Sequence, residues 1–185
     1  AFGLTAVGLC YSRGTRNTQE GEKYLREAVA AWEAIRKESP DDINAMLGVA
    51  HARHWLGSLF LDTKQQEEAE AELREALALR LQVDAEHPQH VDLRSDLAHN
   101  KAYLAIVLRR TARQNEAEKL IRDAIVVREE LVGEDPNVYE HHRRLGALHA
   151  ELCECLLSMG RLDEAVAALR GRIDLQHKLG ADFPK

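Results

Sequence analysis

The four prolines of this chain stand at equal intervals along it. Each lies 48 residues after the one before, and the chain contains no others: Pro40, Pro88, Pro136 and Pro184. A fixed period of roughly 20 to 50 residues is typical of repeat proteins, in which one small unit recurs and stacks on its neighbours. The spacing therefore predicts an array of similar units, each contacting the next, in place of one central core.

The sequence aligns with itself without a gap when it is cut after the prolines. We expect residues 1–185 to form a single repeat domain, with a truncated repeat at 1–40 and complete repeats at 41–88, 89–136 and 137–184. Two positions keep their residue type in all four units: Glu20, Glu68, Glu116 and Glu164, and Arg26, Arg74, Arg122 and Arg170. Ala1 falls at the position of Val49, inside a predicted helix, so we expect the chain to be part of a longer protein.

Each complete unit contains two stretches with helical periodicity. In the second stretch of residues 41–88, apolar side chains recur at i, i+4, i+7 and i+8, on one face of a helix: Ala69, Leu73, Ala76 and Leu77. Short polar breaks such as Thr63–Gln65 separate the two stretches. Each proline ends a second helix, because the residue before proline is pushed out of helical geometry. Only 5% of the residues are aromatic, and the abundant Ala, Leu, Glu and Arg favour helices, so the sequence predicts an all-α fold.

Charge and cysteine usage exclude several classes of partner. The formal net charge is −6 and no basic block is present, so nucleic acid is not an expected partner. The three cysteines show no pairing pattern, which indicates a reducing, cytoplasmic location. Two of them, Cys153 and Cys155, are expected to be small core residues. No apolar stretch is long enough to cross a membrane, so no membrane partner is expected either.

The sequence also lacks the motifs of the common catalytic sites. It contains no Gly-rich phosphate loop, no nucleophile elbow and no His-Glu-x-x-His. We therefore predict a protein that is not an enzyme and needs no cofactor.

Two positions depart from the repeat pattern. Trp32 is expected to be a packing residue, whereas Arg80 and Arg128, at the same position of later units, are expected to reach solvent. Arg172 stands where the other units have alanine, and it follows a glycine inside the helix. Either this helix lies near the end of the array, where outer faces become polar, or Arg172 belongs to a local partner site.

Several segments resemble the tetratricopeptide repeat. The resemblance rests on Leu56-Gly57, on the small residues Ala69, Ala117 and Ala165, and on the apolar residues Leu73, Ile121 and Leu169. That family normally repeats every 34 residues, so the helices here would be longer. The segments Gly160–Arg170, Glu68–Arg80 and Leu179–Pro184 are similar to long repeats found beside bacterial serine/threonine kinase domains.

The resemblance implies a right-handed α-solenoid of antiparallel helix pairs that serves as a non-enzymatic scaffold. The first helices of the pairs would line a concave groove for a peptide or protein segment. The residues expected to face this groove are Arg13, His51, His54, Ser58, Asp62, His99, Arg109, Arg110 and Glu154.

Three alternatives accompany this interpretation. His51, His54 and His99 could form a zinc ligand set, although a polar groove lining without metal is the preferred interpretation. The chain could be a regulatory segment of a larger bacterial signalling enzyme, either a serine/threonine kinase or a signalling ATPase. It could also be an architectural array that assembles with copies of itself.

Overall fold

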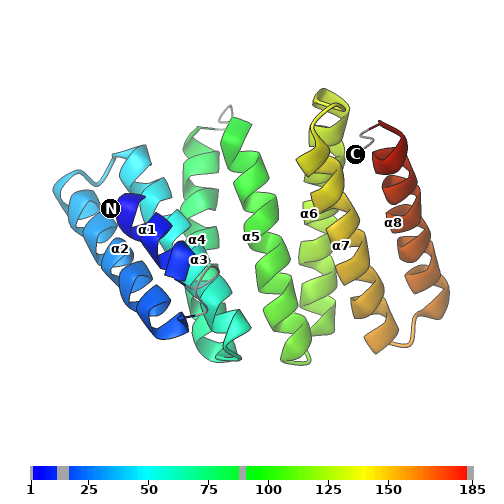
Figure 1. The fold of residues 1–185 in the computed structure, drawn as a ribbon, viewed down its shortest axis with the longest axis horizontal. Coiled ribbons are helices and arrows are strands. Elements are labelled where there is room, and N and C mark those ends of the chain that lie inside the picture. Colours follow the sequence, from blue (N-terminus) through cyan, green and yellow to red (C-terminus); the bar gives the residue numbers. More distant parts are fainter. Residues whose placement is uncertain (1, 12–16, 88–90, 183–185) are drawn as a thin grey trace. The chain divides into compact units, whose positions relative to one another are not determined.

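A computed structural model describes residues 2–11, 17–87 and 91–182. These residues form eight α-helices and no strand, so the prediction of an all-α fold is confirmed (Figure 1). Four positions used in the sequence analysis, Ala1, Arg13, Pro88 and Pro184, lie outside the described residues. Within the described part, no helix is long and apolar enough to span a membrane.

The structure divides into two compact units, Ala1–Leu93 and Arg94–Lys185, which we call unit 1 and unit 2. The first four helices belong to unit 1: α1 (Phe2–Leu9), α2 (Thr18–Glu38), α3 (Ile43–Asp62) and α4 (Gln66–Glu86). The other four are α5 (Val91–Arg110), α6 (Gln114–Glu134), α7 (Tyr139–Ser158) and α8 (Leu162–Asp182). The boundary between the units falls in the first turn of α5, and the prediction of a single repeat domain stays a prediction.

The helix boundaries repeat along the chain. The helices α2, α4, α6 and α8 begin 48 residues apart, and so do α3, α5 and α7. The helices α2, α4 and α6 each end two residues before a proline. The residue between, which is Ser39, His87 or Asp135, has a ψ of 65° to 81°, outside the helical range. This is the geometry that a following proline imposes.

The turn from the first to the second helix of a pair is the same in three places. Lys64, Ala112 and Gly160 have left-handed backbone conformations, with φ of 64°, 60° and 72°. The next residue, for example Arg113, donates its backbone N–H to a carbonyl five positions earlier. This six-residue ring is typical of a Schellman motif, which satisfies the last carbonyls of a helix.

Two glycines allow first helices to pack closely on second helices in unit 1. A Cβ at Gly57 of α3 would lie 2.7 Å from the Cγ of Leu73, and a Cβ at Gly8 of α1 would lie 2.8 Å from the Cγ of Leu25. Leu25 and Leu73 are equivalent positions, but Gly8 and Gly57 are 49 residues apart. Cys10, directly after α1, is π-helical, a conformation that accommodates one extra residue. The gap-free alignment expected for the first repeat is therefore wrong by one residue at α1.

The expectation that Arg80 and Arg128 reach solvent is also wrong. Their exposed fractions are 3% and 1%, and Trp32 at the equivalent position of α2 is buried as well. Trp32 packs against the backbone of α3, where a Cβ at Gly48 would lie 2.4 Å from its ring. Arginine can take the same place because its long aliphatic stem packs like an apolar side chain while the guanidinium finds partners.

Candidate partner-binding site

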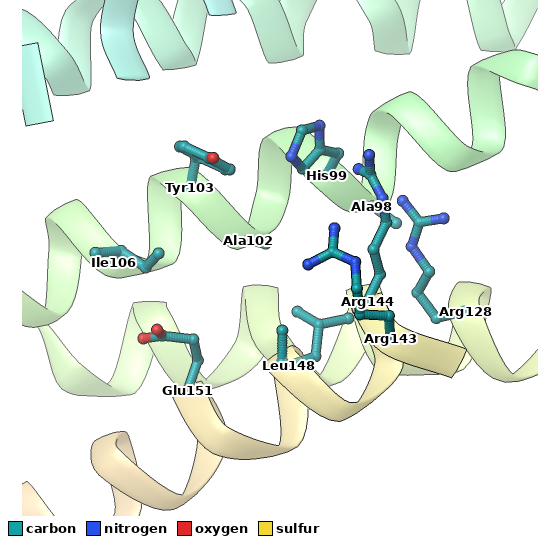
Figure 2. Close-up of a pocket in the computed structure, with 11 residues that line it drawn as sticks. Ala98, His99, Ala102, Tyr103, Ile106, Arg128, Arg143, Arg144, Leu148 and Glu151 are labelled. Atoms are coloured by element: carbon teal, nitrogen blue, oxygen red, sulfur yellow. The ribbon is translucent and has the colours of Figure 1, made fainter. Parts of the chain in front are cut away.

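A pocket of about 240 Å³ lies between α5 and α7 of unit 2, with one wall residue from α6 (Figure 2). We call it the unit 2 pocket. Its apolar wall consists of Ala98, Ala102, Ile106, Ala147 and Leu148. Its polar wall consists of His99, Tyr103, Arg128, Arg143, Arg144 and Glu151.

Small side chains create this space. Ala98 and Ala102 are four residues apart, on one face of α5, and Ala147 lines the same space from α7. Alanine ends at its Cβ, so two long helices can pack along their length and still leave a hollow at these positions. Tyr103 adds an aromatic ring, which offers a large contact area with little loss of conformational entropy.

Arg128 enters the pocket wall from α6 as a buried cation. Its Nη1 donates to the hydroxyl of Ser95 at 2.9 Å, and its Nη2 donates to the Ser95 carbonyl at 2.7 Å. Burial lowers the pKa of Arg128, and the positive charge of Arg144 lowers it further, to about 10. The guanidinium still carries its charge at neutral pH, since this pKa lies well above 7.

Arg143 and Arg144 share a single carboxylate in the first turns of α7. Glu140 accepts hydrogen bonds from Nε and Nη2 of Arg143, at 2.6 and 2.7 Å, and from Nε of Arg144 at 2.6 Å. The spacings of three and four residues bring these side chains together on one helix face. The hydrogen bond from Arg143 is the main cause that lowers the pKa of Glu140, to about 2. Burial opposes this shift, and Arg144 strengthens it.

An ion pair marks the opposite end of the pocket. Nη2 of Arg109 on α5 lies 3.1 Å from Oε2 of Glu151 on α7. Figure 2 shows Glu151 at one end and the three guanidinium groups at the other, with Tyr103 between them. The pocket therefore has a basic end, an apolar middle and a charge-paired end.

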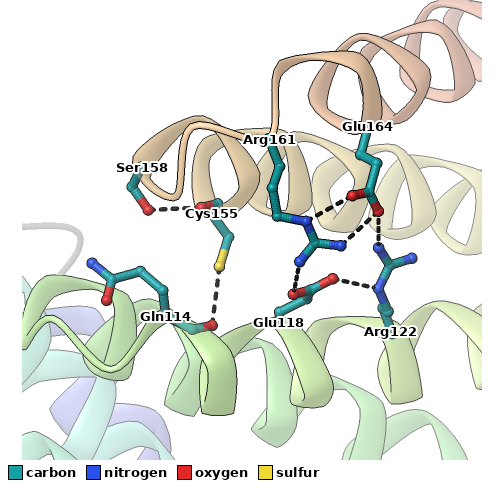
Figure 3. Close-up of polar contacts among 7 residues, drawn as sticks. All are labelled: Gln114, Glu118, Arg122, Cys155, Ser158, Arg161 and Glu164. Atoms are coloured by element: carbon teal, nitrogen blue, oxygen red, sulfur yellow. Dashed lines mark hydrogen bonds and ion pairs between the residues drawn. The ribbon is translucent and has the colours of Figure 1, made fainter.

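A polar network ties the start of α8 to α6, and so helps to position α7 between them (Figure 3). Arg161, in the turn before α8, donates to Glu118 at 2.5 Å and to Glu164 at 2.6 Å. Arg122 donates to Glu118 at 2.8 Å. Nearby, the Cys155 thiol donates to the Gln114 carbonyl at 3.3 Å. Both Cys155 and Cys153 are buried, so their assignment as small core residues is confirmed.

The structure places only part of the predicted groove set at this pocket. His99 lines it, and Arg109 pairs with a residue that does. Arg110 and Glu154 are exposed on α5 and α7 but are not lining residues. The others that the structure describes lie on α3: His51, His54, Ser58 and Asp62. His51 and Asp62 are exposed, whereas only 1% of His54 and 5% of Ser58 is exposed, contrary to the expectation of an open lining.

Most of the charged pocket residues were missed in the sequence. Arg128 occupies a second helix, and the expectation placed the groove on first helices alone. Arg143 and Arg144 form the only adjacent arginine pair besides Arg109-Arg110, which is a signal that could have drawn attention to this helix start.

The zinc alternative gains no support from the side chains that can be examined. Among the described residues, no group of three or more His, Cys, Asp or Glu side chains is arranged to hold a metal ion. His51 and His54 belong to unit 1 and His99 belongs to unit 2.

A second hollow, of about 270 Å³, lies between α7 and α8. Arg143 and Ala147 line both this hollow and the unit 2 pocket, and Arg172 lines only this one. Arg172 is exposed, so its place on α8 is open to water.

Two models of the tetratricopeptide repeat match the sequence. One matches residues 50–82, from α3 into α4, and the other matches residues 101–138, from α5 through α6. The chain carries tetratricopeptide repeats. Such repeats act as protein–protein interaction scaffolds and are generally not catalytic. No match was found among curated protein sequences.

Solved structures with the same fold include BtubC (BKLC) from P. vanneervenii and MamA from MSR-1. BtubC has a TM-score of 0.73 at 16% identity, over 98% of this chain and 65% of that one. MamA has a TM-score of 0.52 at 18% identity, over 95% of this chain and 76% of that one. At these identities the similarity concerns the fold alone. This tetratricopeptide-repeat chain spans slightly less than two thirds of the BtubC chain.

Proposed function

We propose that this protein is a non-enzymatic scaffold that binds an extended peptide segment of a partner protein in the unit 2 pocket. The observation that carries the proposal is the pocket itself, which combines small apolar side chains with charged groups at both ends. A concave, mostly apolar site with a few convergent polar groups is the usual form of a binding site.

The geometry suggests how affinity and specificity would be divided. An apolar side chain of the partner would fill the space beside Ala102 and Leu148 and remove apolar surface from water. The charged ends would fix the direction and register of the segment, since charge complementarity mainly supplies specificity. Because the lining residues stand on helices, the site is largely preorganised and little loop ordering opposes binding.

A peptide selection with a filled-pocket variant tests the proposal. Peptides would be selected from a random displayed library on the full chain, and their dissociation constants measured by calorimetry. We expect Ala102→Phe to weaken the selected peptides at least about tenfold, because the new ring occupies the space that the partner needs. Ala78→Phe is the matched control, since Ala78 is exposed on α4 outside the pocket.

Two results would count against peptide binding at this site. One is a selection that enriches no peptide. The other is equal binding by the two variants, which would move the interaction to another surface of the scaffold.

Self-assembly is a second candidate, and the outer face of α8 favours it. A row of apolar side chains is exposed there, with exposed fractions from 41% to 62%: Leu162, Val166, Leu169 and Ile173. Leu25, Leu73 and Ile121, which occupy the position of Leu169 in the other repeats, are at most 1% exposed. A monomer in light scattering at millimolar protein would reject self-assembly, as would an oligomer that persists in the double variant Leu169→Glu, Ile173→Glu.

A role as a regulatory segment of a larger signalling enzyme is compatible with the same pocket. It would depend on the domain to which the repeats are joined.

A further inference from the structure

The basic end of the unit 2 pocket carries more positive than negative charge. Three guanidinium groups line it, from Arg128, Arg143 and Arg144. The only carboxylate hydrogen-bonded to them among the described residues is that of Glu140. Arg128 donates to neutral oxygens of Ser95 alone. The excess at this end is therefore about two positive charges.

The other acids near the pocket do little to offset this excess. Glu151 lines the pocket but pairs with Arg109 at the opposite end, so these two charges cancel. Asp96 also acts on Arg128, but its side chain is exposed to water and forms no hydrogen bond with the guanidinium. Solvent screens such an interaction strongly.

The same groups keep hydrogen-bond donors available. Arg144 uses only Nε for Glu140, so the four N–H bonds on its Nη1 and Nη2 have no protein acceptor among the described residues. Arg143 uses Nε and Nη2 and leaves Nη1. Figure 2 shows the three guanidinium groups and the His99 ring gathered at this end of the pocket.

Close cations are unfavourable without an anion between them. Arg128 is 1% exposed, and the charge of Arg144 acts on it directly. In a site that excludes water, this repulsion is larger than on an open surface. A doubly charged anion would remove the excess and accept several of the available N–H bonds, whereas a single carboxylate would balance only half of it. Arginine clusters suit phosphate because the planar guanidinium donates two parallel hydrogen bonds to its oxygens.

We propose that the basic end of the unit 2 pocket binds a phosphate-type dianion, which the partner segment carries as a phosphorylated side chain. A phosphorylated serine, threonine or tyrosine has a charge of about −1.5 to −2 at neutral pH, close to the excess in the pocket. The neighbouring apolar wall would then hold the residues beside the phosphorylated one. The identity of the carrier rests on the proposed function above; the anion site does not.

Nuclear magnetic resonance titrations of the full chain test the anion site. Sodium sulfate, inorganic phosphate and sodium acetate are added separately at matched ionic strength, and the Nε–Hε signals of Arg143 and Arg144 are followed. We expect sulfate and phosphate to shift these signals with saturation, and acetate to bind at least about tenfold more weakly. We expect Arg144→Gln to weaken sulfate binding about tenfold or more, because it removes a charged donor.

Two variants serve as controls for position and charge. Arg170→Gln removes an exposed arginine on α8 outside both hollows, and sulfate binding should be unchanged. Arg172→Gln removes the arginine of the hollow between α7 and α8, and sulfate binding should change less than twofold. The proposal is overturned if acetate binds as well as sulfate, or if either control weakens sulfate as much as Arg144→Gln does.

A peptide series then separates this inference from the proposed function. A selected peptide would be compared with serine, glutamate and phosphoserine at one position, and the phosphoserine form should bind at least about tenfold more tightly than either. Tight peptide binding without this preference would leave peptide binding intact and reject the dianion. Saturable sulfate binding with no selectable peptide would keep the anion site and reject the peptide function.

Discussion

The left-handed residue in each helix-to-helix turn shows how one backbone position can be occupied at unequal conformational cost. Gly160 adopts a positive φ without a steric penalty, whereas Lys64 and Ala112 at the equivalent positions have a Cβ. A left-handed conformation costs a non-glycine residue about 1–2 kcal/mol. The surrounding hydrogen bonds over-determine the turn and keep it closed despite this cost.

We therefore expect Ala112→Gly to stabilise the protein by about 1 kcal/mol. The glycine relieves the left-handed strain, although it also gains entropy in the unfolded chain. Gly160→Ala should destabilise by a similar amount, because it introduces the same strain at the equivalent position. Both free energies of unfolding can be measured in urea, and changes of equal sign in the two variants would contradict this account.

The buried arginines illustrate what a residue type alone does not determine. Arginine is mostly exposed in proteins, and so Arg80 and Arg128 were expected at the surface. Whether such a side chain can be buried depends on acceptors that come from another helix. For Arg128 these acceptors are the hydroxyl and carbonyl of Ser95, and their position is known only from the packed structure.

At the scale of the helix, charged pairs act both within and between elements. The pairs Glu22–Arg26, Glu70–Arg74 and Glu118–Arg122 lie on single helices, as their spacing of four residues predicted. Glu118 has a second partner, Arg161, that joins two elements. Burial would raise the pKa of Glu118, but the hydrogen bonds from Arg122 and Arg161 outweigh it and lower that pKa.

The lowered pKa of Glu118 predicts acid sensitivity. A carboxyl group whose pKa is lower in the folded state stabilises the fold at neutral pH, and this contribution is lost as the pH falls below the ordinary value of about 4.5. We expect Glu118→Gln to reduce the free energy of unfolding at pH 7 by about 1–2 kcal/mol. The difference from the wild type should shrink as the pH falls from about 4.5 to 3.

Urea unfolding at a series of pH values measures this difference. Glu75→Gln is the control, because Glu75 is exposed on α4 without a recorded ion pair, and its effect should stay within about 0.5 kcal/mol. A constant difference between wild type and Glu118→Gln from pH 7 to 3 would show that ionisation of this side chain does not contribute to stability.

At the scale of the whole molecule, equivalent positions are not equally buried. Leu73 is 0% exposed in α4, whereas Leu169, at the same position of α8, is 42% exposed. The repeated sequence pattern gives both residues the same type. Their contributions to stability depend on what covers them.

Truncating the two leucines should therefore have different effects. We expect Leu73→Ala to cost about 2–5 kcal/mol, because it removes a fully buried side chain and leaves a cavity. Leu169→Ala should cost no more than about 1 kcal/mol, since much of its surface is already in contact with water. Thermal and urea unfolding would check both values. Equal losses would mean that α8 is covered in solution, which would favour the self-assembly candidate.

Much of the architecture could be predicted from the sequence because it depends on local chemistry that repeats. Three described proline-preceding residues and three left-handed turns stand at matching positions, and each ends a helix through its own backbone preference. The exception was α1, where one extra residue shifts Gly8 relative to Gly57 and only the packing of Leu25 reveals it.

The binding site was less predictable, since it depends on distances between side chains far apart in the sequence. His99 was expected at a site, but its basic neighbours come from α6 and α7. The sequence by itself determined the helices, their repeat and the turns between them, because these follow from neighbouring residues. Only the tertiary structure decided that Arg128 is buried, that Arg143 and Arg144 share one carboxylate, and that a pocket lies beside them, because burial and electrostatic balance arise from the contacts between helices.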